Sequence, residues 1–190
     1  MRAPETTTSR TLLFLPLAHV LAHAVQVICL YARIQVAHSG SPATLLGDLA
    51  SFHPTWLLAV PRVFEKIYNA ALLNAQSGGK EKIFRRGADV AIRWSRALDS
   101  GRMTAPLRLQ RAFYSALIYR RIRAAMGGRL EYAVSGGGPL STDLAHFFRG
   151  VGVTILEGYG LSESSPVACF NHPHIKRKAG SIGVPVRDVQ

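Results

Sequence analysis

One short segment, residues 157–164 (EGYGLSES), places an aromatic ring, a hydroxyl and a carboxylate within five residues of one another. The hydroxyl of Ser162 could donate to a phosphate oxygen, and the carboxylate of Glu163 could hold a hard cation such as Mg²⁺. Tyr159, between two glycines, could stack on a base, although a lone tyrosine more often packs in a core. Glu163 alone is equally consistent with a surface carboxylate. The segment therefore favours phosphate and metal chemistry without fixing a reaction.

Two further features could join such a site. Gly136, Gly137 and Gly138 follow an apolar run, and without side chains they would let a flat ring or a phosphate approach the backbone closely. A tight turn is the common alternative, since the run matches neither the dinucleotide fingerprint nor the P-loop. His19 follows another apolar run, where a histidine is more often a core residue than a ligand or a base. No G-x-S-x-G motif supports a serine hydrolase.

The elements that would position these residues alternate between strand and helix patterns. Strand patterns occur at residues 11–15, 33–37, 55–60, 130–134 and 151–156, and helical patterns at 19–31, 43–52, 63–76, 81–98, 109–122 and 142–148. This alternation predicts an α/β fold with a mostly parallel sheet, flanking helices and a helical insertion at about residues 62–127. Since ligands bind outside the carboxyl ends of parallel strands, the loops with the candidate residues should open on one crevice.

Composition limits the class of protein. The chain has 190 residues, 48% of them hydrophobic, and a formal net charge of +12. The arginines fall between apolar residues at helical spacing, which is typical of the solvated faces of amphipathic helices. A nucleic-acid surface is the weaker interpretation, because no nucleic-acid-binding motif accompanies the charge. Cys29 and Cys169 form neither a CxxC pair nor a disulfide framework, as expected in a reducing compartment.

One apolar stretch allows two interpretations. No charged residue lies between Arg10 and Arg33, and this run is about long enough to cross a bilayer. Pro16, His19 and other polar residues interrupt it, however, and a strand-like run precedes the proline. We therefore expect a strand, a turn and a helix.

Five segments, in this order, carry a family resemblance: 11–20 (TLLFLPLAHV), 60–67 (VPRVFEKI), 134–140 (VSGGGPL), 156–164 (LEGYGLSES) and 180–185 (GSIGVP). Together they resemble the long-chain fatty acyl-CoA synthetases, AMP-forming fatty-acid–CoA ligases of the acyl- and aminoacyl-adenylating superfamily. The tyrosine motif is shared across that superfamily, whereas the segment 60–67 and the helical insertion after it are more particular to the long-chain branch.

The resemblance implies a two-step reaction. A fatty acid carboxylate attacks the α-phosphate of ATP, giving an acyl-adenylate and pyrophosphate, and the thiol of coenzyme A then displaces AMP. Mg²⁺ offsets the negative charge that would repel the carboxylate. The implied partners are thus a long-chain fatty acid, ATP, Mg²⁺ and coenzyme A.

The resemblance also assigns roles to individual residues. Gly136, Gly137 and Gly138 would line the adenine pocket. Tyr159 would stack on the adenine, with Gly160 beside it. Ser162, where the family more often has threonine, would contact the α-phosphate, and Glu163 would bind Mg²⁺. His19 would lie near the acyl carboxylate, and Arg62 would help to shape the acyl tunnel.

In the same family the site is completed by segments that we do not find here. We expect residues 1–10 to be a flexible lead-in and residues 11–190 to be part of an AMP-binding (adenylation) domain. We expect the phosphate-loop segment and the small C-terminal domain to be absent, so that the isolated chain does not form acyl-CoA. A non-catalytic nucleotide- or acyl-binding remnant and a basic membrane-associated protein are the alternatives. We expect a cytoplasmic location, with peripheral association at the inner face of the membrane, and no nucleic-acid partner.

Overall fold

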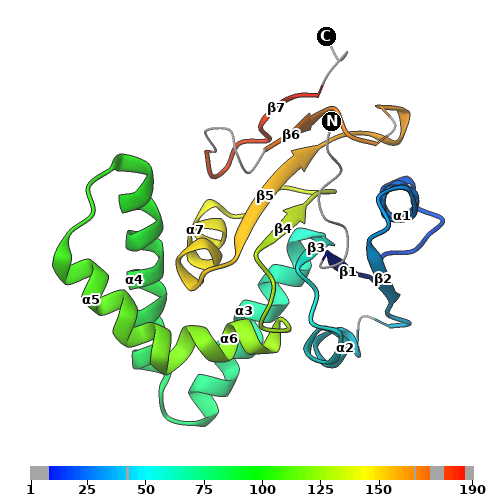
Figure 1. Cartoon of the computed structure of the whole chain (residues 1–190). Coiled ribbons are helices and arrows are strands. Elements are labelled where there is room, and N and C mark those ends of the chain that lie inside the picture. Colours follow the sequence, from blue (N-terminus) through cyan, green and yellow to red (C-terminus); the bar gives the residue numbers. More distant parts are fainter. Residues whose placement is uncertain (1–8, 42, 165, 172–177, 187–190) are drawn as a thin grey trace.

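The computed structural model describes residues 9–41, 43–164, 166–171 and 178–186. Within these residues one sheet has the strand order β2-β1-β3-β4-β5-β6-β7 (Figure 1). The pairs from β2 to β5 are parallel, and the pairs β5–β6 and β6–β7 are antiparallel. The strands are β1 (Arg10–Leu13), β2 (Gln35–His38), β3 (Trp56–Ala59), β4 (Tyr132–Ser135), β5 (Thr154–Tyr159), β6 (Cys169–Phe170) and β7 (Val184–Pro185).

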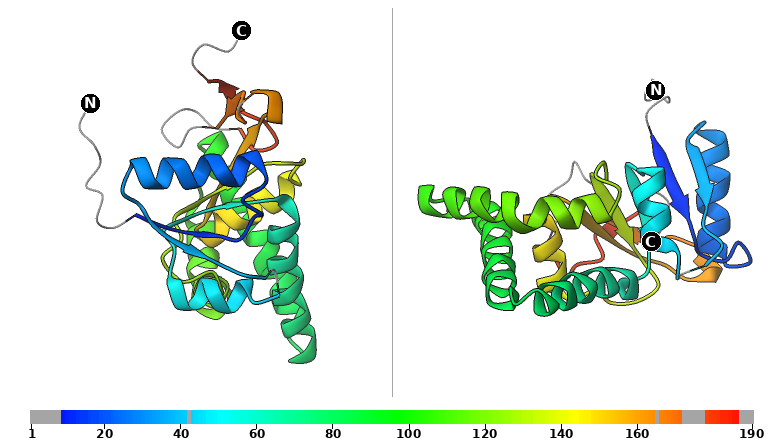
Figure 2. Two further views of the ribbon diagram at one scale, coloured as in Figure 1. Left: turned by 90° about the vertical axis from the view of Figure 1, so that its right-hand side faces the viewer. Right: turned by 90° about the horizontal axis from the view of Figure 1, so that it is seen from below.

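The helices confirm the expected α/β class and its helical insertion. They are α1 (Val20–Tyr31), α2 (Leu45–Phe52), α3 (Pro61–Ser77), α4 (Glu81–Ser100), α5 (Ala105–Tyr114), the π-helical segment η1 (Ser115–Tyr119), α6 (Arg120–Ala125), α7 (Thr142–Val151) and the 3₁₀ turn η2 (Ser162–Ser164). The third helix of the insertion differs from the expectation, because η1 divides it into α5 and α6. Figure 2 shows α3 to α6 extending to one side of the sheet, opposite α1 and β2.

Unequal layers cover the two faces of the sheet. All four residues of β3 are buried, as expected for a strand covered on both sides. Leu57 and Ala59 belong to a large core built with α2, α3, α4, α6 and α7. Trp56 and Leu58 belong to a small core under α1. In the described part of the chain only α1 packs on that second face, so the cover over β4 and β5 is incomplete there.

The helical insertion is held to the sheet by a close crossing of α4 and α7. A Cβ atom added to Gly150 of α7 would clash with the backbone of Ala91 on α4. Tyr119, fully buried, donates its hydroxyl to the carbonyl oxygen of Gly87 on α4 at 2.7 Å. Arg111 donates from Nε to the carbonyl oxygen of Gly150 at 3.0 Å. The insertion therefore forms part of the main core.

The start of the chain agrees with the expected strand, turn and helix. Residues 1–8 of the predicted lead-in lie outside the described residues, and Arg10 is already the first residue of β1. The uncharged run forms β1, a turn and α1. Among the residues that the structure describes, no helix combines the length and the apolar character needed to cross a bilayer.

The α4–α7 crossing gives a prediction with an internal control. Gly150→Ala should lower the free energy of unfolding by about 1–3 kcal/mol, because the added methyl has no space against Ala91. Gly47→Ala, on the exposed side of α2 with nothing within 4 Å of the new Cβ, should raise it by roughly 0.5–1 kcal/mol. Chemical denaturation of both variants measures the difference; equal effects of the two would contradict this packing.

Candidate active site

Loops from three parallel strands meet around one cavity of about 470 Å³. His19 comes from the loop after β1, Gly136 and Gly137 follow β4, and Tyr159, Gly160, Ser162 and Glu163 lie at or after the end of β5; together these residues line the cavity. They sit together because parallel strands present their carboxyl ends at one edge of the sheet. Gly138 is the exception, since it lies against Pro61 and does not line the cavity.

His19 is fixed by a helix cap. It occupies the N-cap position of α1, and its Nδ1 accepts a hydrogen bond from the backbone N–H of Leu21 at 3.3 Å. A neutral imidazole that accepts at Nδ1 carries its proton on Nε2. The ring therefore offers an N–H donor to an oxygen in the cavity, while its other nitrogen is used by the helix.

Glycines let the two loops at the cavity adopt conformations and contacts that a side chain would prevent. Gly137 has a φ of +78°, a conformation that side chains rarely adopt. A Cβ atom at Gly160 would clash with the backbone of Pro166, so the chain can cross itself there only with glycine. Between these loops Tyr159 is 48% exposed, and its ring is available to a ligand rather than packed in the core.

Ser162 and Glu163 lie in the short turn η2, and both are exposed at the cavity. Among the described residues no group of three or more His, Cys, Asp or Glu side chains could hold a metal by itself. Mg²⁺ needs no such cage, because one or two carboxylates together with substrate phosphates commonly bind it. A single carboxylate beside a hydroxyl fits a metal that enters with a nucleotide.

Another part of the cavity wall is apolar. Leu21, Val25 and Ile28 of α1 face Trp56, Leu58 and Val134 of β3 and β4. Ser135 also lines the cavity; it is 2% exposed, and its hydroxyl has no hydrogen-bond partner in the described structure. Such an orphaned hydroxyl is a polar atom available to a ligand. By contrast, Arg62 is not among the lining residues, and its exposed side chain pairs with Glu65 at 3.0 Å.

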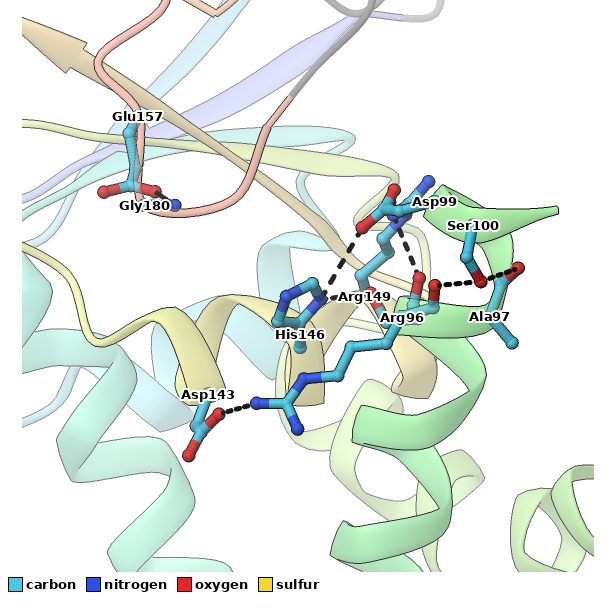
Figure 3. Close-up of polar contacts among 10 residues, drawn as sticks. Arg96, Ala97, Asp99, Ser100, Asp143, His146, Arg149, Glu157 and Gly180 are labelled. Atoms are coloured by element: carbon cyan, nitrogen blue, oxygen red, sulfur yellow. Dashed lines mark hydrogen bonds and ion pairs between the residues drawn. The ribbon is translucent and has the colours of Figure 1, made fainter. Parts of the chain in front are cut away.

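Glu157 binds two loops from behind the site. Its carboxylate accepts a hydrogen bond from the backbone N–H of Gly180 at 2.9 Å (Figure 3). Burial raises the pKa of Glu157, and backbone hydrogen bonds from Gly180 and Leu140 act in the opposite direction. The residue thus connects β5 to the end of the glycine loop and to the segment before β7. No role was predicted for Glu157 from the sequence, although this residue begins the tyrosine motif.

A polar cluster between α4 and α7 was also not predicted from the sequence. Nδ1 of His146 lies 2.9 Å from Oγ of Ser95 and 3.9 Å from Oδ2 of Asp99. Arg149 forms an ion pair with Asp99, and Arg96 donates to Asp143 at 2.6 Å (Figure 3). In the sequence His146 was only one polar residue of an amphipathic helix, and nothing there indicated partners about 50 residues away.

An α/β sheet whose strand ends surround one cavity with a glycine loop, an aromatic ring, a hydroxyl and a carboxylate has the features of a nucleotide-binding protein. A family model described as AMP-binding enzyme matches residues 2–190, nearly the whole chain. The chain belongs to this family of AMP-binding enzymes.

Individual relatives narrow the resemblance. The long-chain-fatty-acid–CoA ligase FadD15 of Mycobacterium bovis is 47% identical over 180 residues, which cover 93% of this chain and 29% of the relative. The expected resemblance to long-chain fatty acyl-CoA synthetases is thereby confirmed. The chain spans less than a third of the length of these curated relatives.

Solved structures share the fold at low sequence identity. The long-chain-fatty-acid-CoA ligase FadD1 of Archaeoglobus fulgidus superposes with a TM-score of 0.58 at 13% identity, over 95% of this chain and 29% of that one. The A-PCP didomain of a carboxylic acid reductase from Segniliparus rugosus was solved in complex with AMP. It superposes with a TM-score of 0.61 at 21% identity, over 84% of this chain and 19% of that one. The fold is that of adenylate-forming enzymes.

The polar cluster predicts a pH dependence of stability. Burial lowers the pKa of His146, an effect that the nearby Arg96 and Arg149 reinforce and Asp99 and Asp143 oppose. The unfolded chain therefore binds more protons than the folded chain, so the free energy of unfolding should fall as the pH drops below about 6.5, the pKa of an unfolded histidine.

The test replaces this one titrating group. His146→Gln keeps a side chain that can bond Ser95 but cannot titrate, so its unfolding free energy should change less between neutral pH and pH about 5. His23→Gln removes an exposed histidine of α1 and serves as the matched control. Denaturant unfolding across this pH range decides: the same pH slope in the wild type and in His146→Gln would show that His146 does not titrate with folding.

Proposed function

We propose that this chain forms the adenylate-binding part of an ATP-dependent ligase that joins a long-chain fatty acid to coenzyme A through an acyl-adenylate. One observation carries the proposal: a single cavity collects His19, Gly136, Tyr159 and Ser162 with Glu163 from loops far apart in the sequence. A non-catalytic remnant that binds the nucleotide or acyl group is the alternative function, and both require this cavity to bind an acyl-adenylate.

Each end of the cavity suits one part of that ligand. Gly136 and Gly137, with Gly138 behind them, would form one wall of an adenine slot, and the half-exposed ring of Tyr159 would stack on the base next to Gly160. Ser162 would donate to the α-phosphate. Glu163 would hold Mg²⁺, whose charge, when it is bound, offsets that of the phosphates.

The acyl group would lie between α1 and the sheet. The Nε2–H of His19 would donate to the acyl carboxylate at the polar end, and the apolar wall formed by Val25, Ile28, Trp56 and Leu58 would contact the hydrocarbon chain. Coenzyme A is the acceptor in the second step. We further propose a cytoplasmic location, with peripheral association at the inner face of the membrane.

Binding is the direct test of this proposal. A non-reactive long-chain acyl-adenylate analogue should raise the thermal unfolding temperature of the chain in a saturable way, and AMP should compete with it, because the ligand binds only the folded state. An analogue that leaves thermal unfolding unchanged at every concentration would exclude both the ligase and the binding remnant.

The metal role of Glu163 can be separated from the nucleotide role of its neighbours. Glu163→Gln should weaken the binding of ATP in the presence of Mg²⁺ by roughly tenfold, since one carboxylate ligand is lost. The metal-free acyl-adenylate analogue should bind with unchanged affinity. Calorimetry with both ligands measures this, and Glu65→Gln, on the exposed side of α3, is the control. An equal loss for both ligands would argue against a metal role.

His19 has two functions that different substitutions distinguish. Asparagine is a good N-cap residue but cannot reach as far as imidazole, so His19→Asn should keep the stability of α1 while weakening fatty acid binding. His19→Ala should weaken binding equally and also cost about 1 kcal/mol of stability. Parallel measurements of fatty acid affinity and of thermal unfolding test this. Full affinity in His19→Asn would remove His19 from the carboxylate site.

A further inference from the structure

The segment formed by α5, η1 and α6 is apolar on two opposite sides. Its inner side packs into the main core through buried residues such as Tyr119 and Ile122. Its outer side exposes three large apolar side chains: Leu109 is 74% exposed, Phe113 59% and Leu117 42%. An amphipathic helix of a globular protein normally turns polar residues outward, so a second apolar side indicates that something else covers it.

The three outer side chains form a continuous stripe. They recur every four residues, which places them above one another along a helix, and the exposed alanines 112 and 116 lie on the same side. We call Leu109, Phe113, Leu117 and these two alanines the outer stripe. Figure 1 and Figure 2 show α5 at the end of the molecule opposite α1 and β2, away from the strand ends that form the cavity.

The segment that carries the outer stripe has charged side chains of one sign. Residues 101–130 contain seven arginines and neither an aspartate nor a glutamate. Two of these arginines serve the fold, since Arg111 lies over the ring of Trp94 and Arg123 donates to the carbonyl oxygen of Val151. The exposed arginines of the segment are Arg102, Arg108, Arg120, Arg121 and Arg129, and no acidic side chain of the described residues pairs with them.

A groove of about 620 Å³ runs beside the stripe, between α4 and α5. Leu109 and Phe113 form one side, and Val90 lies among the α4 residues that line it. Its charged lining residues are Arg86, Arg93 and Asp89, a net excess of one positive charge, and Arg93 donates to Gln110 across the groove at 3.1 Å. The apolar surface is therefore hollowed as well as exposed, and its rim is basic.

We propose that the outer stripe docks on an anionic lipid bilayer. The leucines and the phenylalanine enter the boundary between headgroups and acyl chains, and the flanking arginines meet lipid phosphates, as in basic amphipathic helices that lie in a membrane interface. A nucleic-acid backbone would use the arginines but would leave the stripe exposed to water. This inference gives the expected peripheral association a defined surface, and it requires no part of the proposed reaction.

Another exposed apolar surface provides a contrast. α1 leaves Leu30 72% exposed and Tyr31 93% exposed, but the helix contains no charged residue. Without charged side chains, α1 should bind an anionic lipid surface no more strongly than a neutral one. The combination of an apolar stripe with unpaired arginines occurs on α5 and α6, and this makes them the side that should respond to lipid charge.

The experiment measures co-sedimentation of the chain with lipid vesicles in the absence of any nucleotide or fatty acid. Binding should be strong with vesicles that contain phosphatidylglycerol, weak with phosphatidylcholine alone, and reduced by added salt. Arg120→Ala with Arg121→Ala should lower the partition coefficient by roughly 30-fold. Leu109→Ser with Phe113→Ser should lower it by at least roughly tenfold. Because all four side chains are exposed, thermal unfolding should not change.

Matched double variants complete the design. Arg62→Ala with Lys80→Ala removes the same charge from α3 and the turn after it. Leu30→Ser with Tyr31→Ser removes two large side chains from α1 that are, at 72% and 93%, together more exposed than Leu109 and Phe113. Both should bind like the wild type. The proposal is overturned if the chain binds anionic vesicles no better than neutral ones. It is also overturned if the charge control loses as much binding as the Arg120 and Arg121 variant, or the apolar control as much as the Leu109 and Phe113 variant. A third outcome would also overturn it: the chain binds DNA at low salt but not vesicles, and Leu109→Ser with Phe113→Ser does not weaken the DNA binding. The arginines would then be assigned to a nucleic-acid surface.

Discussion

The parallel pairing of β1, β3, β4 and β5 is the constraint on which the candidate site depends. It brings the ends of strands that are more than 100 residues apart in the chain to one edge of the sheet, where His19, the glycine loop and the tyrosine motif meet. A parallel pair needs a crossover connection, and the crossover between β3 and β4 is the whole helical insertion. The insertion must therefore fold back on the sheet for the site to form, and the close α4–α7 crossing at Gly150 is where it does so.

The sequence predicted the fold class, the alternation of strands and helices, and seven of the residues that line the cavity, namely His19, Gly136, Gly137, Tyr159, Gly160, Ser162 and Glu163. These features are local, since they follow from apolar periodicity and from glycine and proline at element ends. It did not predict the π-helical break at residues 115–119, where packing of the fully buried Tyr119 against α4 accompanies the irregularity. It also missed Glu157 and His146, because their roles depend on partners that only the tertiary structure brings close. Ser135 was missed because only the tertiary structure places its unpartnered hydroxyl at the cavity.

Arg62 and Gly138 show the limit of transferring a role by motif. Neither residue lines the cavity, although Gly138 directly follows Gly137, which does. Arg62 lies in the first turn of α3 and extends into solvent toward Glu65. Gly138 packs against Pro61 and so supports the glycine loop from outside. A motif thus identifies a segment near a site, whereas the side that each residue faces depends on the backbone turn that carries it.

The incomplete layer of helices over the second face of the sheet explains why a cavity exists there. α1 covers Leu13, Trp56 and Leu58, but over β4 and β5 the side chain of Val134 stays half-buried and Tyr159 is half-exposed. A second helix at this place would bury that apolar area and fill the cavity. Because the cavity is open, the free protein lacks the hydrophobic stabilisation that a second helix would supply. A hydrocarbon chain bound between α1 and the sheet would restore part of that stabilisation. Apolar area that lowers the stability of the free protein then becomes a source of affinity for an acyl ligand.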